Sequence, residues 1–470
     1  MLFNSNEFMV FLACFAALYF LSMLARPWLA WRNWLIVIAS FTFYAQWDYR
    51  FTGLLLLTCV SDFAAAQLIA GTEDVRCRRL WLAASITLNL GVLAIFKYFG
   101  FFRESVQLLL ESFGLHCGWK PWLAAVPVGL SFYTFHSMSY VVDVYRKQVV
   151  VCRDFVQFAA YESFFPQLVA GPISRARDVL PQFGQARSVT LEQVEAGLWL
   201  GIWGMFKKVV LADNLAPLVE LVYQRASPSA PMLVLGTFAF GLQIYCDFSG
   251  YSDIAVGLAR ILGFDVGMNF NLPYLAGSLR EFWRRWHISL SSWLRDYLYI
   301  SLGGSRVSAS STCFNLGLTL LLAGLWHGAS LTFVLWGLWH GLGLVANYLW
   351  TSHRPSNRNL PAWVGWMLTQ GFVLFGWMLF RAGSVDKLLE FAGAWHVFTL
   401  PMWWRPYLTS LCVLAIPLAG MQVWQWRSGK LDIVMSLPRW PRAVLQAALL
   451  LVIVAYWPRE DATPFIYFQF

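Results

Sequence analysis

Two histidines lie thirteen residues apart in a stretch that is otherwise apolar. Residues 323–341 read AGLWHGASLTFVLWGLWHG and contain the pentapeptide GLWHG twice, with His327 in the first copy and His340 in the second. Histidine is suited to exchange a proton near neutral pH. An apolar wall disfavours its cationic form and leaves a neutral imidazole that accepts a proton. The segment therefore predicts one general base, with the other histidine as a hydrogen-bonded structural residue.

A second polar constellation lies in residues 279–300, LREFWRRWHISLSSWLRDYLYI. If this segment forms one helix, its polar residues fall within an arc of about 80°, opposite aromatic and leucine side chains. The polar residues are Arg280, Arg284, His287, Ser291 and Arg295. Such a helix lies in the membrane interface or lines a polar cavity. Two interpretations stay open: the arginines reach lipid headgroups, or they line a cytoplasmic funnel and attract an anionic donor, because guanidinium binds phosphate bidentately.

Two carboxylates interrupt a further apolar run, GLQIYCDFSGYSDIAVG at residues 241–257. Asp247 lies one helical turn from both Gln243 and Tyr251, a spacing that permits a buried hydrogen-bond network. The alternative is structural, in which Asp247 and Asp253 tie helices together by pairing with arginine.

The composition places these residues in a membrane protein. The chain has 470 residues, of which 59% are hydrophobic and 13% charged, whereas soluble domains have about 25% charged residues; the mean hydropathy is +0.56. Runs of about 20 apolar residues cross a bilayer as helices, which predicts an all-α polytopic protein with about ten to thirteen spans. The candidate runs are 8–25, 33–47, 52–70, 80–99, 123–142, 155–172, 194–212, 232–260, 313–327, 331–350, 362–380, 407–425 and 443–457. Two prolines and a glycine in residues 161–175 predict a kink or re-entrant turn.

The two histidines of the repeat are predicted to lie on different helices. A single helix from Phe314 to Trp350 would be about 55 Å long, much more than a bilayer requires. Residues 328–330, Gly-Ala-Ser, are the expected break. His327 then ends a helix beside irregular backbone, which at membrane depth typically lines a cavity, whereas His340 lies within the next span. This placement favours His327 as the reactive histidine.

The loops indicate orientation and domain organisation. No basic residue precedes the first apolar run, whereas arginines cluster at 76, 78 and 79, after the third run. The positive-inside bias therefore predicts a periplasmic N-terminus, and no cleaved signal peptide is expected. The polar linkers are short, which predicts a single membrane domain over residues 1–470 and no separate soluble domain. The net charge of +9 fits basic loops on anionic lipid and does not indicate nucleic acid. The eight cysteines have no metal-ligand spacing, so no metal is predicted.

Five motifs together resemble the membrane-bound O-acyltransferase (MBOAT) family, and most closely its bacterial branch that O-acetylates exopolysaccharides such as alginate, with a cellulose-acetylating relative left open. They are FFPQLVAGPISR (164–175), QIYCDFSGYSDIAVGLAR (243–260), EFWRRWHISLSSWLRDYLYISLGG (281–304), GLWHGA (324–329) and FIYFQF (465–470). The resemblance implies the MBOAT fold, with membrane helices and re-entrant segments around a central tunnel in the bacterial inner membrane. It implies that His327 is the catalytic histidine and that His287 is the second motif histidine.

The same resemblance implies acetyl-CoA as the donor, no bound cofactor, and movement of acetyl across the inner membrane to the polymer. Implied partners are membrane lipid, a periplasmic acetyltransferase or adaptor of the SGNH-like type, and a polysaccharide synthesis and export complex. Acyl transfer to a hydroxyl needs a base, assigned to His327, and stabilisation of the donor carbonyl, assigned to His287. No G-x-S-x-G motif supports a serine triad. The expected donor-binding or supporting residues are Arg280, Arg284, Ser291, Arg295, Asp247, Asp253, Trp326 and His340.

Two other functional classes are weighed against the enzyme. A transporter or flippase for a lipid-linked sugar or acyl group would also place charged residues in the membrane, but no inverted repeat is visible. A scaffold for a polymer-export complex would make both histidines dispensable. The concentration of histidine and arginine between residues 280 and 340 favours a single reaction centre, and hence the enzyme.

Overall fold

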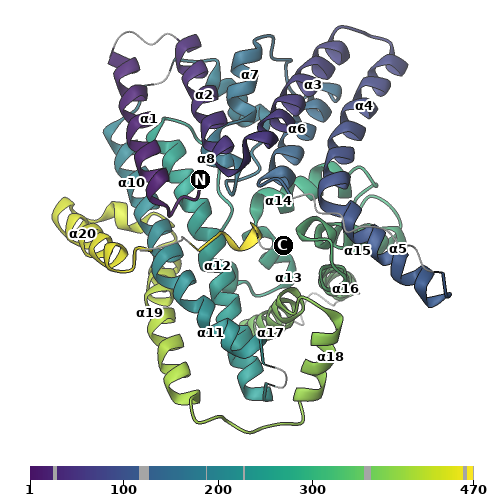
Figure 1. Cartoon of the computed structure of the whole chain (residues 1–470), viewed down its shortest axis with the longest axis vertical. Helices are drawn as coiled ribbons and strands as arrows, with labels where there is room; N and C mark the ends of the chain where they lie inside the picture. Colours follow the sequence, from purple (N-terminus) through teal and green to yellow (C-terminus); the bar gives the residue numbers. More distant parts are fainter. Residues whose placement is uncertain are drawn as a thin grey trace. The chain divides into compact units, whose positions relative to one another are not determined.

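A computed structural model describes residues 1–24, 29–115, 126–186, 188–225, 228–353, 361–458 and 463–468. The chain packs into two compact units: a first unit of residues 1–194 and 258–267, and a second unit of residues 195–257 and 268–470. The helices of both are shown in Figure 1. The described residues form α, 3-10 and π helices without strands, which confirms the all-α prediction. The single membrane domain stays a prediction.

The described residues contain six helical stretches that are long and apolar enough to cross a membrane. They are Leu29–Ala70, Val75–Ser112, Ala230–Ile261, Ala309–His327, Ala362–Arg381 and Trp404–Ser428. These stretches establish a multi-pass membrane protein, while the larger number of spans and the central tunnel stay predictions. The start of the predicted run 123–142 lies outside the described residues.

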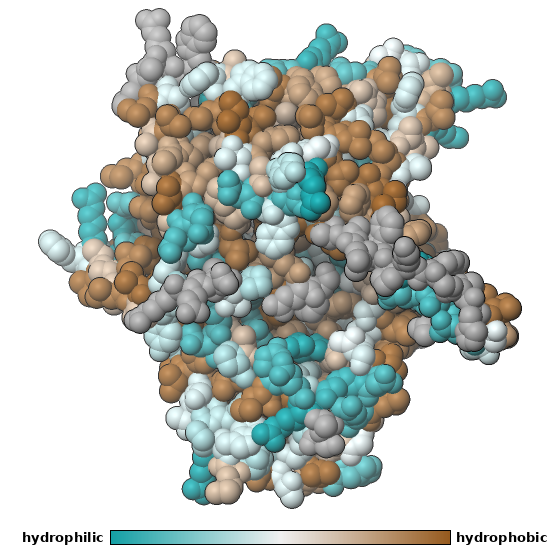
Figure 2. Space-filling model, viewed as in Figure 1, coloured by the Kyte–Doolittle hydropathy of each residue, from teal (hydrophilic) through white to brown (hydrophobic). Residues whose placement is uncertain are grey.

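The first unit is built mainly from the N-terminal helices. Their bounds are α1 Asn6–Leu24, α2 Leu29–Asp48, η1 Tyr49–Phe51, α3 Thr52–Ala70, α4 Val75–Leu93, η2 Ala94–Tyr98, α5 Phe99–Ser112, α6 Leu130–Tyr145, α7 Phe155–Glu162, α8 Phe165–Leu168 and α9 Ala176–Phe183. Apolar residues on these helices point outward as well as inward: Leu18 and Leu21 are 56% and 60% exposed. Figure 2 shows hydrophobic side chains over much of the face formed by α1, α2 and α3. Such an outer surface fits lipid better than water.

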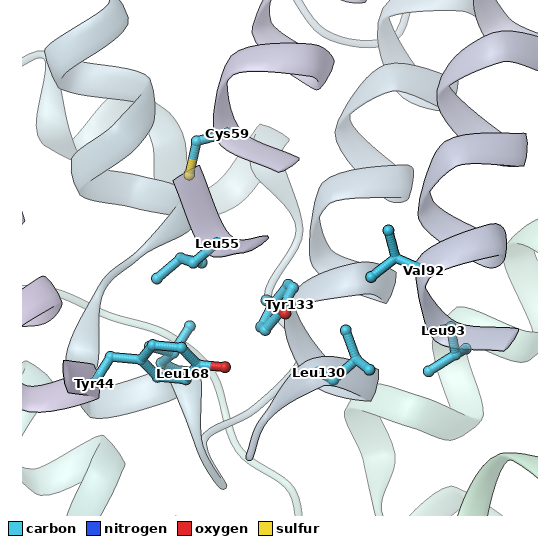
Figure 3. Packing of buried hydrophobic residues seen from close by; sticks show 8 residues of the cluster. All are labelled: Tyr44, Leu55, Cys59, Val92, Leu93, Leu130, Tyr133 and Leu168. Carbon is cyan, nitrogen blue, oxygen red and sulfur yellow. The ribbon is translucent and has the colours of Figure 1, made fainter. Parts of the chain in front are cut away.

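The interior of the first unit contains a compact apolar cluster, shown in Figure 3. Its members come from α2, α3, α4, α6 and α8 and are Tyr44, Leu55, Cys59, Val92, Leu93, Leu130, Tyr133 and Leu168. The Tyr44 hydroxyl, which is the polar end of this ring, donates a hydrogen bond to the Val128 carbonyl at 3.0 Å. The Tyr44 ring is therefore buried among apolar side chains while its hydroxyl has a hydrogen-bond partner inside the unit.

The predicted run 155–172 is not one helix, and the predicted kink is confirmed. Helix α7 ends at Glu162 and the short α8 begins at Phe165, followed by Pro166 in its first turn. Proline lacks an N–H and is tolerated there, but it cannot continue a preceding helix. The Phe165 N–H instead donates to the Ser40 hydroxyl at 3.1 Å, so the break leaves this donor satisfied.

The second unit contains the remaining helices, and α10 enters it from the first unit. Their bounds are α10 Leu191–Met205, η3 Phe206–Ala212, α11 Asp213–Tyr223, α12 Ala230–Ile261, η4 Pro273–Leu275, α13 Leu279–Arg285, α14 Ile288–Trp293, η5 Leu294–Tyr299, α15 Ala309–His327, α16 Leu331–His353, α17 Ala362–Arg381, α18 Val385–Ala394, α19 Trp404–Ser428, η6 Ile433–Ser436, α20 Arg439–Ala455 and η7 Ile466–Phe468. All the candidate site residues lie in this unit.

Helices α15 and α16 pack closely because glycines lie at their contact. A Cβ added to Gly324 would overlap the Phe333 carbonyl oxygen, and one added to Gly337 would lie 2.6 Å from the Leu320 carbonyl oxygen. Backbone therefore meets backbone without an intervening side chain, as small residues allow between membrane helices. This contact fixes the C-terminal end of α15, where His327 lies.

The first prediction tests this helix contact. Gly324→Ala should lower the free energy of unfolding by about 1–3 kcal/mol, because the added methyl overpacks against backbone that cannot move aside. Gly317→Ala is the matched control on the same helix, since its Cβ would meet open space, and alanine favours a helix over glycine by about 1 kcal/mol. The midpoints of thermal unfolding in detergent measure both. Equal midpoints would contradict the glycine-mediated contact.

Candidate functional site

His287 lies between two short helices and not within a long one. Helix α13 ends at Arg285 and α14 begins at Ile288, while His287 has left-handed backbone angles, φ 43° and ψ 54°. A left-handed residue ends a right-handed helix. The prediction of one helix over residues 279–300, with five polar residues on one face, is therefore wrong.

The turn at His287 is held by a buried asparagine. The Ile288 N–H donates to the Asn269 carbonyl at 2.9 Å, and the Ser289 hydroxyl donates to the Asn269 side chain at 2.5 Å. The Asn269 amide in turn donates to the Ser252 hydroxyl on α12 at 3.0 Å. These bonds fix the direction of the His287 ring against α12. They hold His287 in a left-handed backbone conformation, which costs free energy for a residue other than glycine.

The break in the backbone changes what the polar residues of this segment can do. His287 is buried, whereas Arg280, Arg284 and Arg295 are exposed. The Arg295 guanidinium pairs with the adjacent Asp296 carboxylate at 2.7 Å. The half-buried Ser291 donates its hydroxyl to the Trp286 carbonyl at 3.1 Å. The Arg295 and Ser291 side chains therefore bond to groups other than the His287 ring.

His327 is the last residue of α15, as predicted from the length of the apolar run. Gly328 has an extended backbone and α16 begins at Leu331, which confirms the expected break at residues 328–330. A Cβ at Gly328 would overlap the Phe333 ring, so the chain passes close to α16 at this point. His327 is 4% exposed and faces the interior of the second unit.

Tertiary packing brings His287 and His327 into one cluster of five rings. The Trp326 ring lies 5.8 Å from His287 and 5.0 Å from His327, measured between ring centroids. On the other side, Phe248 lies 4.6 Å from His287, and Tyr467 lies 4.7 Å from Phe248 and 5.5 Å from His327. We call Phe248, His287, Trp326, His327 and Tyr467 the five-ring cluster. Two imidazoles are thus held within one aromatic enclosure.

His340 lies outside this cluster. Its ring contacts Trp336 at 4.8 Å and Trp283 at 5.2 Å, and Trp336 separates it from His327. A Cβ added to Gly376 would lie 2.6 Å from the His340 Nε2, so α17 packs directly on this imidazole. The mid-helix position of His340 is confirmed, and its close packing favours the structural interpretation.

The five-ring cluster has the properties that acid–base chemistry needs. Burial lowers the pKa of His287 to about 3, so its imidazole is neutral at physiological pH. A neutral imidazole has one nitrogen that donates and one that accepts a hydrogen bond. The His327 ring contacts the rings of Trp326, Trp336, Phe380 and Tyr467, and Tyr467 adds a hydroxyl to this wall. Aromatic walls exclude water and strengthen electrostatic interactions within the site.

The two predicted carboxylates pair with lysines. Asp247 lies 2.8 Å from the Lys208 Nζ, and Asp253 lies 2.8 Å from the Lys207 Nζ. These ion pairs connect α12 to η3, so the arginine partners expected from the sequence are wrong, while the role of the two carboxylates in the site stays a prediction. Both lysines lie in the predicted run 194–212, and sequence reasoning missed them. Two adjacent charges in an apolar run were the available signal, because such charges are rarely unpaired in a membrane protein.

Tyr467 was also missed as an individual residue. The motif FIYFQF pointed to the C-terminal segment, but no periodicity relates residue 467 to His327, 140 positions earlier. Only the fold brings this ring to the histidine.

The second prediction concerns the left-handed turn. His287→Asn should leave the protein folded, because asparagine tolerates this backbone region. His287→Val should lower the free energy of unfolding by about 1–2 kcal/mol relative to His287→Asn, since a β-branched residue is strained there. The thermal unfolding midpoints of the two variants in detergent measure this difference. Indistinguishable midpoints would show that the turn relaxes without cost.

The fold and the site define a class: a multi-pass helical membrane protein with a buried pair of histidines at a helix break. Residues 122–383 match the membrane-bound O-acyltransferase family, MBOAT, and the chain belongs to this family. It is therefore an O-acyltransferase, and the enzyme interpretation is confirmed.

Three relatives illustrate the breadth of the similarity. The chain is 42% identical to the probable alginate O-acetylase AlgI of Azotobacter vinelandii, over 89% of this chain and 83% of that protein. It is 41% identical to the probable alginate O-acetylase AlgI of Pseudomonas aeruginosa, over 89% and 80%. It is 33% identical to the peptidoglycan O-acetyltransferase of Helicobacter pylori, over 80% and 76%.

Proposed function

We propose that this protein moves acetyl groups from a cytoplasmic donor across the inner membrane for the O-acetylation of an exopolysaccharide, with alginate as the first candidate polymer and cellulose as the second. The observation that carries the proposal is the five-ring cluster, in which Trp326 bridges His287 and His327 inside a buried wall. The names of the three relatives described above agree on acetyl as the group and on a polysaccharide as the acceptor.

His327 is the general base in this proposal. An acceptor hydroxyl attacks the carbonyl carbon of the acetyl thioester while its proton passes to a ring nitrogen of His327. A tetrahedral oxyanion forms, and the carbon–sulfur bond then breaks as the imidazolium returns the proton to the leaving thiolate. His287 donates a hydrogen bond toward the oxyanion or the donor carbonyl. The apolar surroundings support this sequence because burial keeps the His287 imidazole neutral, so that it can donate a hydrogen bond without carrying a charge.

The donor is acetyl-CoA in this proposal, and it approaches from the cytoplasm. Its phosphates match the exposed guanidinium groups of Arg280 and Arg284, one helical turn apart on α13. Delivery to the polymer uses a periplasmic acetyltransferase or adaptor of the SGNH-like type and a polysaccharide synthesis and export complex. The corresponding location is the bacterial inner membrane with a periplasmic N-terminus.

The third prediction separates the two histidines of the repeat. His327→Ala should lower the acetyl content of the cell's exopolysaccharide by at least about 100-fold, because a positioned general base contributes roughly 10²–10⁴-fold. His340→Ala, which removes a packed ring away from the five-ring cluster, should lower the acetyl content only as far as the level of folded protein falls. Acetyl per unit of membrane-inserted protein is the measurement. Persistent acetylation in the His327 variant would refute its role as base.

The fourth prediction concerns donor recognition. Arg280→Ala and Arg284→Ala should each raise the KM for acetyl-CoA by about 3–10-fold with little change in kcat, because exposed charge-assisted contacts contribute about 1 kcal/mol. Arg295→Ala should have a smaller effect, since Asp296 already engages that guanidinium. Arg427→Ala, an exposed arginine at the end of α19, is the control. Equal KM values for all four variants would show that the donor binds at another part of the protein.

A further inference from the structure

A buried cluster of charges lies against the C-terminal segment, residues 463–468. The Lys208 ammonium, on the π-helical η3, lies 2.7 Å from Asp213 and 2.8 Å from Asp247. The Lys208 side chain is only 1% exposed. One cation therefore faces two anions, an arrangement that persists in an apolar environment only if further groups complete it.

The C-terminal segment supplies the completing groups from its backbone. The Lys208 ammonium donates to the Pro464 carbonyl at 3.3 Å, and the Ile466 N–H donates to the Asp247 carboxylate at 2.6 Å. Both are charge-assisted hydrogen bonds, which are stronger than neutral ones. Figure 1 shows the segment, in yellow, crossing α12.

Side-chain packing connects the C-terminal segment to the histidines. Phe465 is fully buried and lies 4.7 Å from the Tyr251 ring, and Tyr467 follows two residues later in η7. Because backbone contacts fix both Pro464 and Ile466, Tyr467 is directed against His327 at 5.5 Å. The same charged cluster that holds the segment therefore places one wall of the five-ring cluster.

We propose that Lys208 and Asp247 are positioning residues. They hold the C-terminal segment against the site, so that the Tyr467 ring keeps water away from His327. This inference rests on the proposed acetyl transfer. Neither charged group touches the reacting atoms in this proposal, since both act through the segment. Loss of the Lys208 charge leaves two buried carboxylates to repel each other, and one of them is the acceptor that holds Ile466.

The chain contains a matched control one residue away. Lys207 is also buried, and its ammonium lies 2.8 Å from Asp253 and 2.8 Å from the Ser249 hydroxyl. Both of these partners lie on α12 and not in residues 463–468. Removal of either lysine costs the ion pair of a buried ammonium group, but only removal of Lys208 releases the segment.

The test compares Lys208→Met with Lys207→Met in the full-length purified protein. Carboxypeptidase digestion followed by intact-mass measurement reports access to residues 463–468. Trimming should be about tenfold faster in the Lys208 variant than in wild type and within about twofold of wild type in the Lys207 variant, because proteolysis tracks the open population. Thermal unfolding midpoints of both variants are measured in parallel.

Kinetics supply the second readout. The Lys208 variant should lose at least about tenfold in kcat, as expected for a displaced wall of the site, while the KM for acetyl-CoA stays within about twofold. The Lys207 variant should retain kcat apart from any loss of folded protein. If both variants resist trimming and lose activity equally, the positioning role is overturned.

A second pair keeps the test decisive if Lys208→Met does not accumulate. Asp247→Asn weakens the bond to Ile466 with little change in shape, and Asp253→Asn is its control because Asp253 pairs with Lys207. Faster trimming in the first variant alone supports the inference, and equal trimming overturns it. If wild type transfers no acetyl group to a polysaccharide, the proposed function fails, whereas the digestion result still decides how the segment is held.

Discussion

Buried charged groups around the site have ionic or hydrogen-bonding partners, and the arrangement of the site depends on these partners. Leaving an ion uncompensated in a low-dielectric interior costs several kcal/mol, so each buried charge fixes the elements that carry its partners. In the second unit, Lys208 with Asp213 and Asp247 joins η3, α11 and α12. In the first unit, the buried Asp62 accepts hydrogen bonds from Ser85, Asn89 and Ser137 on α4 and α6. Partners of buried charged groups therefore connect helices in both units, through ion pairs in the second unit and through hydrogen bonds to Asp62 in the first.

Two kinds of irregular backbone position the histidines. His327 ends a helix because the following Gly328 is extended, and His287 occupies a left-handed turn between α13 and α14. A regular helix would have placed either imidazole among neighbouring turns of its own helix. At these breaks, each ring instead projects toward other elements: His287 contacts Trp326 and Phe248, and His327 contacts Trp336 and Tyr467. Broken helices are a general way to build polar sites at membrane depth.

Particular segments show how far sequence reasoning reaches. The break after His327 was predictable because one helix over the whole apolar run would be much longer than the bilayer is thick. The kink in residues 155–172 was predictable because proline cannot continue a helix. The turn at His287 was not, since histidine has no strong preference for left-handed angles and the bonds that hold the turn come from Asn269, eighteen positions earlier. For the same reason, the partners of Asp247 and Asp253 were assigned to the wrong residue type.

The sequence by itself determined that the chain is helical and crosses a membrane many times, because hydropathy and helix length act locally. Its motifs also determined the family and singled out His287 and His327. Tertiary structure alone decided that these histidines share one enclosure, that Trp336 separates His340 from His327, and that Tyr467 closes the wall. Such contacts join positions up to 256 residues apart, as between Lys208 and Pro464. No local pattern encodes them, because they depend on which helix faces meet.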